Sequence, residues 1–210
     1  MEKRLAMTTS PGRTGSMPRA LYRVHQFIQA LAAQPLTPRE RERVASILPA
    51  SQQVLFWRMS ASDQRHSLQV MQTLAAQGES DADLLVAALL HDLGKSFYPL
   101  RLWERPAVVL IRHLRPLAAD RWGRQTEGEP LGWRRPFVIY EQHAVWGARM
   151  AEAAGCSPRT VWLIRWHHAS SDGRNAGLQS TAPPESPALQ ARERPASELL
   201  RVLQRADSIN

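Results

Sequence analysis

The sequence predicts an all-α fold, and three observations carry this prediction. Apolar residues recur at helical spacing along most of the chain, for example at Leu68, Met71 and Leu74. Helix start signals repeat, as in Thr37–Glu40, which has a capping threonine, a proline and a capping glutamate, and in Ser157–Pro158. No stretch alternates apolar and polar residues with period two over a convincing length. We therefore expect a single helical bundle without a β-sheet.

The first half of the chain contains five expected helices after a polar tail. Residues 1–18 are rich in Gly, Ser, Thr and Pro, so we expect this tail to be disordered. The first four helices are expected over residues 19–33, from 37 towards 48, over 51–59 and over 63–76. Ser80 and Asp83 are predicted to cap a fifth helix, whose apolar run 84–90 ends at His91-Asp92.

The second half begins with an amphipathic, arginine-rich helical region over 99–122, which we expect Pro106 and Pro116 to interrupt. A loop over 126–135 then precedes a helix over 136–154 that Gly155 closes. The next helix starts at 157 and reaches the histidines at 167 and 168. Residues 170–195 contain two glycines and several prolines and are expected to be a mobile connection to the last helix, over 195–207.

Length and composition indicate one soluble domain. The chain has 210 residues and shows neither a repeat nor a composition break, so we expect a disordered tail over 1–18 and one helical domain over 19–210, with its functional core at about 60–210. The single cysteine, Cys156, excludes an intramolecular disulfide and fits a reducing compartment. Neither a signal peptide nor a transmembrane stretch is found, so the expected location is the cytoplasm.

The charge pattern indicates an anionic ligand. The formal net charge is +8, and of 27 cationic residues only Lys3 and Lys95 are lysines. Such a charge attracts nucleotides, nucleic acids or acidic membrane surfaces. Lysine is a compact charge suited to a phosphate oxygen near a metal, which singles out Lys95 beside the His-Asp pair. The alternative interpretation is a solvated residue after a helix end.

Five of the seven histidines and two aspartates form the most informative pattern. Imidazole and carboxylate ligands suit the divalent ions of Fe, Mn, Co, Ni and Zn, and the sequence leaves the choice among these metals open. A bridging Asp92 could join two cations, one with His66, His91 and Asp207 and the other with the remaining histidines, because a carboxylate has two oxygens. Two such ions can clamp a phosphoryl group during hydrolysis. The members of the pattern are His66, His91, Asp92, His143, His167, His168 and Asp207.

Each member also has an ordinary structural interpretation. A single histidine more often caps a helix or hydrogen-bonds in a core than it binds a metal, and we expect His25 and His113 to be of this kind. Asp207 alone would be an ordinary surface acid near the C-terminus. Adjacent residues on a helix diverge by about 100°, so His91 and Asp92 can serve one site only if the helix ends there. Gly94 supports such an end.

These residues resemble the HD superfamily of metal-dependent phosphohydrolases, from about 65 to 207. The segments that carry the resemblance are Arg65–Leu68, Ala87–Lys95, Glu141–His143, Trp166–His168 and Arg205–Asp207. The resemblance implies a helical fold and a cation bound by His66, His91, Asp92 and Asp207. The additional histidines are similar to the binuclear branch, which includes cyclic-dinucleotide phosphodiesterases and in which a lysine placed like Lys95 touches a substrate phosphate. Asp92 and Lys95 are therefore the expected catalytic residues.

The chain departs from the HD-GYP enzymes that cleave cyclic di-GMP. After the histidine pair it continues to Asp172-Gly173 but lacks the Gly-Tyr-Pro of those enzymes. They also carry a glutamate where this chain has Ser62, so a third metal is not expected. The neighbouring Asp63 is interpreted as a charge at a helix N-terminus, with a role behind the metal ligands as the alternative.

The expected substrate is a nucleotide-type phosphate ester or anhydride. HD enzymes that act on cyclic di-AMP and others that cleave diadenosine tetraphosphate are comparable, so a cyclic dinucleotide or a dinucleoside polyphosphate is the leading expectation. The acidic pair found in HD hydrolases of guanosine tetraphosphate is absent after Asp92. The alternative function is a non-catalytic HD module that binds a nucleotide or a protein partner.

Other partners are less well supported by the sequence. No nucleic-acid-binding motif is present, so specific nucleic-acid binding is not expected. The region Leu102–Trp122 is basic and amphipathic, and it could touch a membrane or a second subunit, but we expect it to pack on its own domain. The sequence leaves the oligomeric state open, a homodimer included.

Overall fold

The computed structural model describes residues 34–99, 101, 104–124, 129–169 and 194–210. Within these ranges the chain forms helices, turns and irregular segments and contains no β-strand, so the all-α prediction is confirmed. The expected tail over 1–18, the helix over 19–33 and the mobile connection up to residue 193 lie outside the described residues. The described helices are α2 (Pro38–Ala45), α3 (Ala50–Arg58), α4 (Ala61–Ala76), α5 (Ala82–Leu90), η1 (Leu93–Ser96), α6 (Glu104–Leu114), α7 (Pro116–Gly123), η2 (Gly132–Arg134), α8 (Arg135–Ala153), α9 (Pro158–Trp166) and α11 (Ala196–Ile209).

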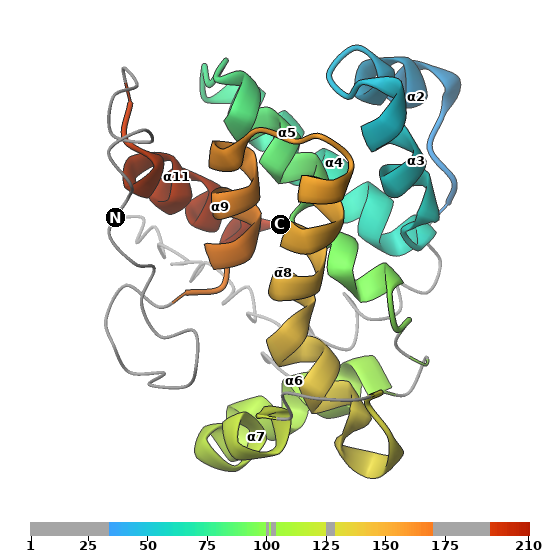
Figure 1. The fold of residues 1–210 in the computed structure, drawn as a ribbon, viewed down its shortest axis with the longest axis vertical. Helices are drawn as coiled ribbons and strands as arrows, with labels where there is room; N and C mark the ends of the chain where they lie inside the picture. Colours follow the sequence, from blue (N-terminus) through green and yellow to red (C-terminus); the bar gives the residue numbers. More distant parts are fainter. Residues whose placement is uncertain (1–33, 100, 102–103, 125–128, 170–193) are drawn as a thin grey trace, which may run out of the picture.

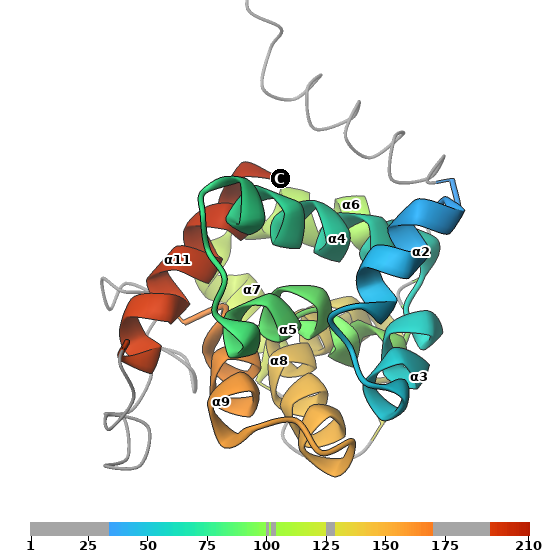
Figure 2. The same cartoon turned by 90° about the horizontal axis from the view of Figure 1, so that it is seen from above.

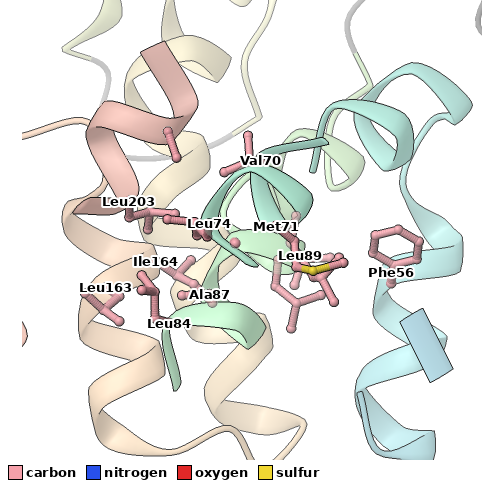
Figure 3. Packing of buried hydrophobic residues seen from close by; sticks show 14 of the residues in the cluster. Phe56, Val70, Met71, Leu74, Leu84, Ala87, Leu89, Leu163, Ile164 and Leu203 are labelled. Carbon is pink, nitrogen blue, oxygen red and sulfur yellow. The ribbon is translucent and has the colours of Figure 1, made fainter. Parts of the chain in front are cut away.

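Helix α5 lies at the centre of the bundle. It packs against α4 on one side and against α9 on the other, and α11 completes this layer (Figures 1 and 2). Most of its residues are apolar, which suits a helix that is covered by neighbouring helices on several sides. Figure 3 shows the contact region, where Leu84 and Ala87 of α5 face Ile164 of α9 and Leu74 of α4. The residue that follows this helix therefore emerges from the middle of the core.

Most of the expected caps are present. Thr37 forms both hydrogen bonds of the capping box with Glu40, and the Ser157 hydroxyl accepts a hydrogen bond from the Thr160 backbone N–H. The prediction that Ser80 and Asp83 cap α5 was wrong, because the Asp81 carboxylate accepts a hydrogen bond from the Leu84 N–H. Asp83 instead accepts a hydrogen bond from Ser157 and joins α5 to α9.

Helices α6 and α7 pack on the first half of α8, at the end of the molecule opposite α2 (Figure 1). Their own small core consists of Val108, Ala119 and Phe137. The prediction that Pro106 interrupts this region was wrong. Pro106 is the third residue of α6, where a proline is tolerated because the first N–H groups of a helix have no partner within it. Pro116 does separate α6 from α7, which it opens.

Within the described residues, no helix reaches the length and apolar character that crossing a bilayer requires.

Candidate metal centre

The end of α5 determines where His91 and Asp92 lie. The last helical residue is Leu90, His91 is the C-cap, and Asp92 has left helical geometry with φ −91° and ψ 3°. Both side chains are buried, at 1% and 2% relative exposure. Because the helix ends at Leu90, before both residues, the two neighbouring side chains can face the same place, which the sequence analysis required for a shared site.

Gly94 allows this turn to lie directly against α8. A Cβ atom at Gly94 would lie 1.8 Å from the carbonyl oxygen of His143 and 2.7 Å from the backbone nitrogen of Gly147. The helix ends before Gly94, as the sequence indicated, but the φ of Gly94 is not positive. The position needs glycine because two backbones approach closely there. This approach brings His143 to Asp92.

One oxygen of Asp92 faces the histidines of the first half of the chain. Asp92 Oδ2 lies 3.6 Å from Nε2 of His91 and 4.0 Å from Nε2 of His66, which α4 supplies. Asp207 of α11 closes this group, with its Oδ1 2.8 Å from His66 Nε2 and 3.6 Å from His91 Nε2. Residues 141 positions apart in the chain are thus neighbours here.

The other oxygen of Asp92 faces the histidines of α8 and α9. Asp92 Oδ1 lies 3.5 Å from His143 Nε2 and 3.9 Å from His167 Nε2. His168 joins this group from the same turn as His167, and one donor atom from each of the four residues lies within 4.8 Å of the others. His66, His91 and Asp92 form a second group by the same criterion. Asp92 belongs to both groups, so all seven predicted site residues come together around it.

The buried histidines are oriented for ligation by Nε2. The Nδ1 atoms of His91, His143 and His167 lie 2.9, 2.7 and 2.7 Å from the backbone carbonyls of Ala88, Tyr140 and Ile164. A carbonyl only accepts hydrogen bonds, so each Nδ1 carries a hydrogen and the Nε2 atom of each ring faces Asp92, where its lone pair is available whenever Nε2 carries no proton. These three Nε2 atoms and Asp92 Oδ1 are buried without a hydrogen-bond partner.

Four unpartnered polar atoms at one point would be costly in an ordinary core. A buried polar group without a partner costs about 1–3 kcal/mol, yet here the four atoms converge. Three imidazole nitrogens and a carboxylate oxygen are suitable ligands for divalent transition metals. The residues present therefore fit a metal site, on the evidence of their orientation and their missing partners.

Comparison with known proteins agrees with this geometry. The family model described as HD domain matches residues 64–210, which is more than half of the chain. The chain belongs to the HD-domain family. Neither the curated proteins nor the solved structures contain a match to it. HD domains typically are metal-dependent hydrolases, and the matched range contains every residue of the two ligand groups.

The charges of this HD domain act differently on the two sides of Asp92. Burial would raise the pKa of Asp92, but Lys95 and His91 outweigh burial and hold it well below its usual range. Burial would likewise lower the pKa of His91, but Asp92 and Asp207 raise it to about 9. On the other side, burial and then the neighbouring His168 ring keep the pKa of His167 well below 6.5, so this ring stays neutral. Neutral imidazole is the form that binds a metal.

Lys95 lies on the carboxylate that both groups share. Its Nζ is 2.5 Å from Asp92 Oδ2, and the side chain keeps 24% exposure. Burial would lower the pKa of Lys95, but Asp92 and then Asp63 raise it, so the ammonium is charged. Asp63 is the third residue of α4, where it accepts a hydrogen bond from the Ser60 hydroxyl. Asp63 is therefore both a charge near a helix N-terminus and a neighbour that acts on Lys95.

Sequence reasoning missed one group of residues beside the centre. The ring of Tyr140 lies 5.3 Å from that of His168 and 6.1 Å from that of His143. The guanidinium of Arg112 stacks 4.2 Å from the centroid of Tyr140 and pairs with Glu141 at 2.5 Å. Burial raises the pKa of Tyr140, which keeps the phenol protonated near neutral pH. The spacing of three residues before His143 was a signal for Tyr140, because both then share one helix face.

Proposed function

We propose that this HD domain hydrolyses a nucleotide-type phosphate ester or anhydride with two divalent transition-metal ions bridged by Asp92. The observation that supports two ions is the division of the Asp92 carboxylate, whose two oxygens face different histidine groups. When bound, such ions supply a nucleophile from water and polarise the phosphoryl group. The candidate metals remain Fe, Mn, Co, Ni and Zn, since mixed histidine and carboxylate ligation suits all of them.

Lys95 is the proposed contact to the substrate phosphate. Its ammonium has three hydrogens, and the Asp92 carboxylate accepts one of them. The remaining hydrogens and the partial exposure of the side chain leave it able to donate to a phosphoryl oxygen. Donors fixed where negative charge develops lower the barrier to phosphoryl transfer. Asp92 thus has two proposed roles, to bridge the metal ions and to hold Lys95.

A nucleotide is favoured over a simple phosphate by the aromatic residues that follow Lys95. Phe97 lies at the end of η1, and its side chain is 55% exposed. Its ring contacts Tyr98 at 4.8 Å and Trp146 at 5.8 Å between centroids. The exposed Phe97 ring follows the proposed phosphate contact, Lys95, by two residues, and an exposed aromatic ring can stack on a nucleobase. A cyclic dinucleotide or a dinucleoside polyphosphate offers both chemical features.

The first experiment measures metal content and turnover on the same preparation. Untagged protein is analysed for transition metals and then incubated with cyclic dinucleotides and dinucleoside polyphosphates in the presence of the metal found. We expect about two ions per chain and turnover of at least one of these compounds. Asp92→Asn, which keeps the side-chain shape, should lose both metal and turnover. His113→Asn changes a histidine outside the ligand pattern and should retain both.

Three results would contradict this proposal. One ion per chain with full activity would exclude the bridged pair. Tight binding of a nucleotide that stays intact with metal present would favour the non-catalytic HD module. Turnover by Asp92→Asn at the level of the unchanged protein would show that another part of the chain carries the chemistry.

A further inference from the structure

The end of the molecule formed by α6, α7 and η2 exposes an unusual share of its apolar side chains. Among the described side chains, eight large hydrophobic residues are exposed, and five of them lie on this end. Figure 1 shows α6 and α7 at the lower end, away from α2 and α3. We call these five residues the tip face: Leu110, Leu114, Leu117, Leu131 and Trp133.

Helix α6 is apolar on two sides, and its own domain covers only one. Val108 is buried and Ile111 packs against the small core, as the sequence analysis expected. Leu110 and Leu114 are one turn apart on the opposite side and are 58% and 66% exposed. Leu117, at the start of the next helix α7 and three residues after Leu114, is 81% exposed. Exposed apolar residues that gather in this way typically mark an interaction surface.

The tip face continues across α7 to the segment before α8. The Trp122 ring on α7 contacts that of Trp133 at 5.0 Å, with the rings nearly perpendicular. The Trp133 side chain remains 58% exposed, and Leu131 next to it is 70% exposed. Tryptophan is enriched where protein meets the interfacial region of a membrane, because its ring is apolar and its N–H is polar.

The charges around the tip face are positive. Arg115, Arg121, Arg124 and Arg134 are all exposed. Glu129 is the one exposed acid among the described residues from 104 to 135. The other described acids of this region are buried and paired with arginine: Asp120 with Arg112, and Glu104 with Arg135.

We propose that the tip face docks this protein peripherally on an anionic lipid surface. Leucine and tryptophan side chains on a basic rim match the two requirements of such binding, apolar insertion and attraction to anionic headgroups. Two copies joined through this face would bring arginines against arginines, so the charge favours lipid over self-association. A nucleic acid would match the arginines but would leave the three leucines in water. The proposal concerns a surface away from the ligand groups and does not depend on the proposed function.

The test is cosedimentation of the full chain with vesicles at low and moderate salt. Vesicles of phosphatidylcholine with about one third phosphatidylglycerol should pellet the protein, and vesicles of phosphatidylcholine alone should not. The triple variant Leu110→Gln, Leu114→Gln, Leu117→Gln should lower the partition coefficient at least about tenfold. Val54→Gln is the matched control, because Val54 is an exposed apolar residue on α3 at 60% exposure, and it should leave binding unchanged.

A charge variant provides a second, independent measurement. Arg115→Gln with Arg121→Gln leaves the apolar side chains in place and should weaken binding by roughly fivefold for each arginine removed. If circular dichroism shows that the leucine variant is unfolded, this charge variant decides the test.

Three outcomes would overturn the proposal. Equal pelleting with neutral and anionic vesicles, or none with either, would exclude anionic lipid as the partner. An equal loss of binding in Val54→Gln would show that the tip face has no special part. A protein dimer in sedimentation velocity that the leucine variant converts to monomer would show that a second copy covers this face.

Discussion

Gly94 lies directly against the backbone of His143, and this approach connects the two ligand groups. A methyl group at Gly94 would be 1.8 Å from the His143 carbonyl oxygen, which is shorter than any real contact of a Cβ atom. The turn after α5 and the middle of α8 are both helical backbone that cannot yield easily. The position of Asp92 between the two histidine groups therefore depends on residue 94 having no side chain.

Gly94→Ala should destabilise the protein and displace Asp92 from His143. We expect a loss of roughly 3 kcal/mol or more in the free energy of unfolding, because the overlap involves backbone atoms. Gly78→Ala is the control, because a Cβ there meets nothing within 4 Å. Its only cost in stability is the backbone strain of a non-glycine residue at a φ of +86°. Urea denaturation of both variants measures the difference. Equal stability of the two variants would show that η1 can move away from α8.

Two histidine variants should separate the two ligand groups. His143→Asn removes a ligand from the group on Asp92 Oδ1, and His66→Asn removes one from the group on Asp92 Oδ2. Each should reduce the metal content from about two ions to about one, since the remaining group keeps its own donors. Elemental analysis and calorimetric titration measure this. A complete loss of metal in both variants would instead indicate strong coupling between the sites.

The helical fold was predictable because its signals are local. The capping residues of α2 and α9 and the apolar spacing of α4 are properties of a few neighbouring residues. The cap of α5 was misplaced by one residue because Ser80, Asp81 and Asp83 are all good capping residues, and only the contact of Asp83 with Ser157 decides among them.

The site could be predicted as a set of residues but not as a geometry. The order of histidines and aspartates indicated which residues meet, and the structure brings all seven together. The assignment of each Asp92 oxygen depends on the turn after α5 and on the close approach at Gly94, which no local pattern encodes. Arg112 reaches Tyr140 from a separate helix, so no spacing in the chain could link them.

The metal-free protein should lose stability as the pH rises from about 6.5 to about 9. The pKa of His91 is raised from 6.5 to about 9 in the folded state, mainly by Asp92 and Asp207 against the effect of burial. A group whose pKa is higher in the folded state stabilises the fold fully at a pH below its unfolded-state pKa. This contribution is lost as the pH rises through its folded-state pKa. The shift corresponds to about 3 kcal/mol. The lowered pKa of His167 acts below pH 6.5 and leaves this window unchanged.

Chelator-treated protein provides the measurement, as urea midpoints at pH 6, 7.5 and 9. His91→Asn should flatten the alkaline part of the profile even if it lowers stability overall, because it removes the titrating group. A profile with the same alkaline slope in His91→Asn would assign the effect to another residue. Added metal should abolish the slope, since it takes the place of the proton on the ring.

Phe97→Ala should weaken the binding of a nucleotide and leave the chemistry of the metal centre intact. Phe97 is exposed, and its ring touches those of Tyr98 and Trp146 at the surface. The fold should therefore not depend on this ring. Loss of one stacked base costs about 1–3 kcal/mol, which predicts a rise in KM of roughly fivefold to a hundredfold with kcat nearly constant. A phosphate anhydride without any aromatic group, such as inorganic tripolyphosphate, is the control substrate, and its KM should not change. Because Phe97 follows Lys95 by only two residues, a fall in kcat for both substrates would mean that the substitution disturbs Lys95 and that the ring has no separate role in recognising a base.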